Sequence, residues 1–208
     1  MEFQFRGANC MRLATKDAVI FTDPVIGGVK VKTDKATTVL ATQKSLLGEH
    51  KEGIFTVDTP GEYELSGVSI HGIPVRGHME EEGKESAVMY KIMTSDLNVL
   101  VTGHIFPKLT DEELETIGHI DVLVVPVGGN GYTLDATGAV AVIRAIEPKL
   151  VIPTHYKDSG VKYEVPQSEI KLFLDELGVQ SSNDEDKLKV KGANLPEVLS
   201  VTVLNRTA

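Results

Sequence analysis

Residues 121–129 read DVLVVPVGG, and this stretch sets the organisation of the second half of the chain. An apolar run of strand length that ends in a glycine-rich turn predicts a buried strand. The turn leads into a helical pattern over residues 135–146, which begins with Asp135. The stretch therefore predicts a strand, a loop and a helix in succession.

The same alternation continues on both sides of this stretch. Thr110, followed three residues later by Glu113, carries the signature of a helix-opening capping box. A further helix is expected over residues 167–177, where Gly178 stops it. Strands are expected at residues 150–153, 187–190 and 199–204, and the polar segment 181–186 is expected to be a loop.

The first half of the chain is predicted to be almost entirely β. Short β-branched and alternating runs predict strands, and Asp23-Pro24 ends the third of them. Strands are expected at residues 2–6, 10–14, 18–22, 37–42, 53–57, 61–73, 87–93 and 98–102. Strands followed by alternating helices and strands predict an α/β protein with two packed sheets flanked by helices, a four-layer αββα sandwich in one domain spanning residues 1–208.

Composition narrows the classes of function. The 208 residues carry a net charge of −9, which argues against nucleic acid as the main partner. Cys10 is the only cysteine, so the chain can form neither an internal disulfide nor a cysteine zinc ribbon. We expect no secretory leader and no membrane span, and therefore a cytoplasmic protein.

Several segments resemble, in order, the metallo-β-lactamase superfamily. They read NCMRL at 9–13, FTDP at 21–24, DTPGEYE at 58–64, DVLVVPVGG at 121–129 and IPTHY at 152–156. The most similar branch is that of predicted metal-dependent hydrolases similar to L-ascorbate-6-phosphate lactonase. The resemblance implies an αββα sandwich and hydrolysis assisted by zinc or manganese.

The resemblance also implies a first metal-binding cluster, His-x-His-x-Asp-His, and this chain departs from it. The aligned positions hold Gln43, Ser45, Leu47 and Gly48, which supply no imidazole or carboxylate. His50 lies two residues beyond the last position, and we expect it to be an exposed loop histidine, since a lone imidazole rarely holds a metal.

The other ligand positions of the family are kept only in part. His78 is displaced by one residue, His104 stands where the family has a bridging Asp, and His155 matches the terminal histidine. Asp135 falls in a loop that borders the metal site in relatives. These residues leave two hypotheses: a reduced three-histidine site for zinc or manganese, or a metal-free pocket.

Pocket candidates beyond the histidines are Gln43, Lys44, Arg76 and the glycine-rich turn 128–131, where close ligand approach is possible. The shortage of ligands favours a non-catalytic or metal-free protein with a retained small-molecule pocket, no resident cofactor and a possible homo-oligomer. The alternative is a metal-dependent hydrolase of a small ester, lactone or phosphorylated metabolite.

Overall fold

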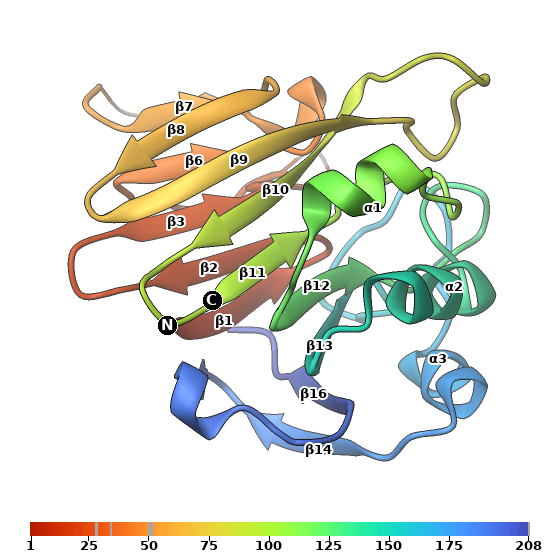
Figure 1. Cartoon of the computed structure of the whole chain (residues 1–208). Helices are drawn as coiled ribbons and strands as arrows, with labels where there is room; N and C mark the ends of the chain where they lie inside the picture. Colours follow the sequence, from red (N-terminus) through yellow and green to blue (C-terminus); the bar gives the residue numbers. More distant parts are fainter. Residues whose placement is uncertain (28, 34, 50–51, 208) are drawn as a thin grey trace.

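The computed structural model describes residues 1–27, 29–33, 35–49 and 52–207 (Figure 1). Two β-sheets are stacked, and α-helices pack against one of them. The α/β architecture with two packed sheets predicted from the sequence is confirmed.

The first sheet holds the N-terminal half of the chain. Within the described residues it has six strands, in the order β15-β1-β2-β3-β6-β7. Their bounds are β15 Leu188–Lys189, β1 Glu2–Gly7, β2 Cys10–Ala14, β3 Val19–Thr22, β6 Thr38–Leu40 and β7 Phe55–Val57. Strand β1 alternates between half-buried and buried residues, because only one of its faces is turned to the core.

The second sheet holds most of the rest. Its eight strands in the described part of the chain run in the order β14-β16-β13-β12-β11-β10-β9-β8. Their bounds are β14 Ser181–Glu185, β16 Ser200–Leu204, β13 Leu150–Thr154, β12 Val122–Pro126, β11 Asn98–Val101, β10 Ala87–Met93, β9 Val68–Val75 and β8 Gly61–Leu65. Strands β11, β12 and β13 are parallel, so their carboxyl ends meet at one edge of the molecule.

Alternate residues of the second sheet face two different apolar layers. Val122 and Val124 belong to the core between the sheets, whereas Leu123 and Val125 belong to the layer beneath the helices. Strand β12 is buried along its whole length because both of its faces are covered. The continuous apolar run in the sequence therefore has a structural cause.

The helices are α1 (Asp111–Ile117), α2 (Ala136–Ile146) and α3 (Ile170–Leu177). The capping box of α1 is confirmed: the Thr110 amide donates to Glu113 Oε2 at 2.6 Å, and the Glu113 amide donates to Thr110 Oγ1 at 3.2 Å. Helix α3 begins at Ile170, later than expected, because Gln167 is buried and is engaged by a histidine instead.

The polar segment 181–186 is not the loop that its composition suggested. Residues Ser181–Glu185 form β14, which pairs in parallel with β16 at the edge of the second sheet. An edge strand has one free side, so a polar sequence suits it. A short hairpin, β4 (Val25–Ile26) with β5 (Val29–Lys30), was also not anticipated.

The outer face of the first sheet is covered differently from that of the second. Its apolar cluster is centred on Cys10, Phe21 and Val39, and within the described residues it takes its partners from strands and loops rather than α-helices. Short 3₁₀ turns, η1 (Lys44–Leu46) and η2 (Gly192–Asn194), complete the structure. None of the helices in the described ranges has the length and apolar character needed to cross a bilayer.

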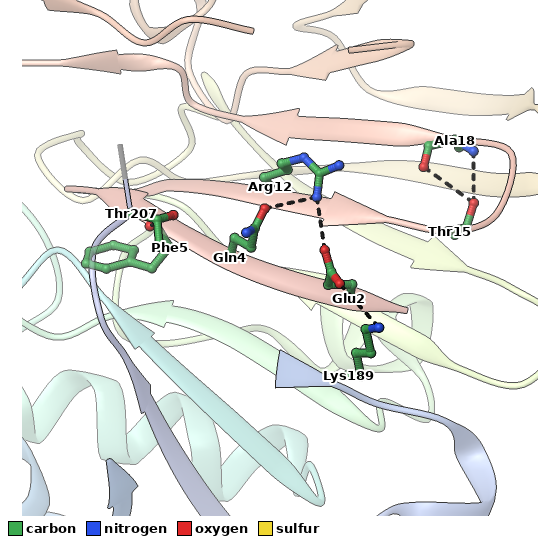
Figure 2. Close-up of polar contacts among 8 residues, drawn as sticks. All are labelled: Glu2, Gln4, Phe5, Arg12, Thr15, Ala18, Lys189 and Thr207. Atoms are coloured by element: carbon green, nitrogen blue, oxygen red, sulfur yellow. Dashed lines mark hydrogen bonds and ion pairs between the residues drawn. The ribbon is translucent and has the colours of Figure 1, made fainter. Parts of the chain in front are cut away.

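Side-chain contacts tie both ends of strand β1 to neighbouring segments. Figure 2 shows Arg12 Nη1 donating to Gln4 Oε1 at 3.0 Å and to Glu2 at 3.3 Å, while Lys189 lies 3.8 Å from Glu2. At the other end of β1, Thr207 Oγ1 donates to the Phe5 carbonyl at 3.2 Å. The C-terminal segment is thereby laid along the first sheet.

Candidate functional site

The candidate site lies where the carboxyl ends of parallel strands from both sheets meet. Asp23 follows β3, His104 follows β11 and His155 follows β13. Loops beyond the carboxyl ends of parallel strands are the usual place for a ligand in open α/β sheets. The family's last histidine position therefore falls in a suitable place.

A buried chain of hydrogen bonds joins the two sheets at this edge. Thr154 Oγ1 donates to Asn9 Oδ1 at 2.8 Å, and Asn9 Nδ2 donates to Asp23 Oδ2. Asp23 also accepts from the Thr42 amide and the Thr42 hydroxyl, each at 2.7 Å. All four side chains are buried, and we refer to them below as the Asp23 network.

The position of Asp23 is costly in two respects. Its φ of 42° lies in the left-handed region that non-glycine residues seldom adopt. Burial raises the pKa of Asp23 to about 6, although hydrogen bonds from Thr42 and Asn9 favour the carboxylate. The surrounding structure must supply the energy that holds this group in place.

His104 and His155 form a pair beside the network. Their ring centroids are 4.8 Å apart, with the rings nearly perpendicular. Burial and the neighbouring His155 and His78 hold the pKa of His104 well below its usual value, and burial also lowers the pKa of His155. Both rings are therefore neutral at pH 7.

The two histidines differ in their partners. His155 Nδ1 lies 3.1 Å from Gln167 Oε1, an oxygen that can only accept, so the ring proton is on Nδ1. Both ring nitrogens of His104 are buried, and within the described residues neither has a hydrogen-bond partner. His78 is tied nearby, since its Nδ1 lies 3.2 Å from the Ile105 carbonyl oxygen.

A cavity of about 270 Å³ opens onto the pair and the network. Tyr132 and Tyr163 flank His155, with ring centroids 5.8 and 5.2 Å from it. The other polar residues of the wall are Asn9, Asp23, Ser45, His104, Glu164 and Gln167. The described residues of this wall include two acids and no lysine or arginine, and the size of the cavity suits a small molecule.

The other pocket candidates are held elsewhere. Asp135 caps helix α2, where it accepts from the Gly138 amide at 2.7 Å. Arg76 donates to the Glu80 carbonyl at 2.8 Å and stacks 3.7 Å above the Phe106 ring. None of Gln43, Lys44, Arg76 or Asp135 lines the cavity, so a binding role for them stays a prediction.

Sequence reasoning missed the residues that build the wall between the histidines. Asn9, Asp23, Tyr132, Tyr163 and Gln167 all contact the cavity. The signal for Asp23 was the FTDP stretch, in which a carboxylate directly follows a buried strand. Tyr132 directly follows the glycine-rich turn 128–131, whose own residues do not line the cavity.

Among the described residues, the donor set does not fit the metal that the family implies. A tight divalent site needs three or more converging nitrogen, sulfur or carboxylate ligands. Across the described ranges, no three His, Cys, Asp or Glu side chains are placed so that they could hold an ion together. His50, the nearest histidine to the altered cluster, lies outside the described residues.

Stacked mixed sheets with a cavity at the strand ends define a protein of the metallo-β-lactamase fold. Residues 2–155 match the family described as the beta-lactamase superfamily domain, and the chain belongs to this family.

Individual relatives agree with this assignment. A metal-dependent hydrolase from Natranaerobius thermophilus is 24% identical over 186 residues, which cover 75% of this chain and 83% of that protein. A metal-dependent hydrolase from Thermoplasma acidophilum is 40% identical over 48 residues, only 22% of this chain and 21% of that protein.

Solved structures extend the likeness to the whole fold. A crystal structure from Thermotoga maritima, assigned to the zinc-dependent hydrolases of the metallo-β-lactamase superfamily, is 26% identical with a TM-score of 0.76 and covers 98% of both chains. A structure from Parabacteroides distasonis is 17% identical with a TM-score of 0.68, over 98% of this chain and 93% of that one, and shares the fold.

Proposed function

We propose that this protein is a member of the family without metal-dependent hydrolase activity, which uses the inherited cavity to bind a small polar molecule. The observation that carries the proposal is the replacement of the first metal-binding cluster by Gln43, Ser45, Leu47 and Gly48. Ligand number and geometry determine metal affinity, so the loss of this cluster removes most of the binding energy.

The groups that remain are suited to hydrogen bonding. Neutral imidazoles can donate and accept, and the two tyrosines and Asn9 add further donors and acceptors. Asp23 is committed to Thr42 and Asn9, which limits its use as a general base. The cavity therefore offers recognition rather than an aligned acid–base pair.

A second candidate keeps the catalytic metal. Histidines that bind metals usually donate their other ring N–H to a protein oxygen, and both His78 and His155 have Nδ1 against such an oxygen. The Nε2 atom of each would then carry a lone pair that can bind a metal. His104 lies between these two histidines in the sequence. The names of the relatives also favour this candidate.

Elemental analysis distinguishes the two candidates. The protein would be supplemented with zinc or manganese, passed through a desalting column and analysed for bound metal. We expect far less than one ion per chain, and no difference between the native protein and His104→Ala or His155→Ala. One ion per chain that is lost in both variants would establish the reduced histidine site instead.

A further inference from the structure

A second and larger cavity lies on the outer side of the first sheet, away from the histidine pair. Its volume is about 700 Å³, within the range of sites for drug-sized ligands. Of the described residues, Gly27 alone lines both this cavity and the inner one. The segment 158–165 separates the two, with Lys162 lining the outer cavity and Tyr163 lining the inner one.

The floor of the outer cavity is apolar. Phe21, Ile26 and Val31 belong to the cluster on the outer face of the first sheet, the face without helical cover in the described residues. Val161 adds a fourth apolar wall residue. Apolar surface exposed in a hollow gains free energy when a ligand excludes water from it.

The rim of the outer cavity is basic. Arg6, Lys32, Lys162 and Arg206 line it, and none of the described residues that line it is an aspartate or glutamate. One of these cations is paired with an acid: Arg206 Nε donates to the Asp158 carboxylate at 2.6 Å. Four cations around one hollow contrast with the net charge of −9 for the chain and create a local positive field.

Two glycines lie close to residues of the rim, one against the Lys162 backbone and one against the Arg206 guanidinium. A β-carbon on Gly27 would lie 2.0 Å from the Lys162 carbonyl oxygen, and one on Gly160 would lie 1.8 Å from Arg206 Nη2. Glycine is required at position 27, where the neighbour is backbone, whereas the Arg206 guanidinium could move away from a β-carbon at position 160. The tail that carries Arg206 is also fixed, because Thr207 is hydrogen-bonded to the Phe5 carbonyl (Figure 2).

We propose that the outer cavity is a binding site for an amphipathic organic anion, a carboxylate attached to an apolar body. The apolar body would lie on the half-buried Ile26, Val31 and Val161, above the buried Phe21, and the carboxylate would lie between the basic side chains of the rim. Arginine and lysine bind carboxylates through charge-assisted hydrogen bonds. This site is independent of the inner cavity and of whether the inner cavity holds a metal.

Calorimetric titration of the full chain with octanoate tests the proposal. We expect saturable binding of one octanoate per chain, affinity that rises roughly fourfold for each added CH₂ from hexanoate to decanoate, and weaker binding in higher salt. Octylammonium, with the same apolar chain and the opposite charge, should not bind. Amide resonances of Val31 and Val161 should shift on titration, while those of Tyr132 and His155 should not.

Charge-reversal variants identify the rim. The Lys32→Glu and Lys162→Glu double variant should weaken octanoate binding at least tenfold. Lys108→Glu is the matched control, since Lys108 is exposed and does not line the cavity, and its affinity should equal that of the native protein. Equal binding of octylammonium, or an unchanged affinity in a folded double variant, would overturn the proposal.

Discussion

The Asp23 network and the histidine pair lie side by side, yet they satisfy their hydrogen bonds in opposite ways. Each of the four network side chains is bonded to at least one other, and the chain of bonds runs from β13 through the β1–β2 turn to the loop after β6. In the pair, His155 has Gln167, whereas His104 has no partner for either ring nitrogen within the described residues.

This difference indicates a structural role for the Asp23 network and a ligand-binding role for His104. Buried polar groups are almost always hydrogen-bonded, and an exception needs an explanation such as a functional role or an ordered water or ligand. The network needs nothing more to be stable. His104 lines a cavity and is left with two unused nitrogens, so it is the group at which a ligand would gain most.

Asn9→Ala should have the largest effect, because Asn9 is the central member of the network. The substitution removes one of the hydrogen bonds to the buried Asp23 carboxylate and leaves the Thr154 hydroxyl without its Asn9 partner, which should cost about 3 kcal/mol of unfolding free energy. Urea denaturation followed by circular dichroism measures this loss. Asn205→Ala removes an exposed asparagine and should change stability by about 0.5 kcal/mol at most. Equal losses in the two variants would show that the network does not join the sheets.

The pH dependence of stability should come next in size. Because the pKa of Asp23 is raised to about 6 in the folded state, against about 3.9 in the unfolded chain, the folded protein holds the proton more tightly. Protonation of Asp23 therefore stabilises the folded protein fully below pH 4. This stabilisation, about 3 kcal/mol, is lost as the pH rises through 6.

The Asp23→Asn variant lacks this titrating group but keeps all the histidines of the native protein. The effect of the histidines on pH-dependent stability therefore cancels when the two proteins are compared. The stability of Asp23→Asn relative to the native protein should therefore increase by up to about 3 kcal/mol from pH 4 to pH 7. Urea denaturation at a series of pH values checks it. A difference that stays flat over this range would mean that burial does not perturb the Asp23 carboxyl.

The sequence predicted the fold better than the site, for physical reasons. Long apolar runs such as residues 121–126 and caps such as Thr110 with Glu113 are local signals, so the strands and helices could be located from them. Strand β14 was not predicted, because edge pairing is made by the backbone and tolerates polar side chains.

The site depends on contacts between distant segments. Asn9 meets Thr154 across 145 positions of sequence, and no local pattern signals such a contact. His104 and His155 were found because they fall at positions of a family motif. Gln167 was assigned to a helix, since nothing in its neighbourhood indicates that it would bond to His155.

The smallest effects on stability are expected for substitutions of the two histidines, and these effects should have opposite signs. His104→Phe removes two buried nitrogens without partners and places an apolar ring beside an open cavity, so it should stabilise the protein by about 1 kcal/mol. His155→Phe breaks the bond to Gln167 and leaves that buried amide oxygen without its partner, so it should cost about 1–2 kcal/mol.

Urea denaturation of both variants without added metal measures this difference in stability, and the same measurement with added zinc tests whether the histidines bind metal. If zinc stabilises the native protein but neither variant, the histidines act together as ligands; if zinc has no effect on any of the three, the opposite signs of the two substitutions reflect only the presence or absence of a partner in the protein.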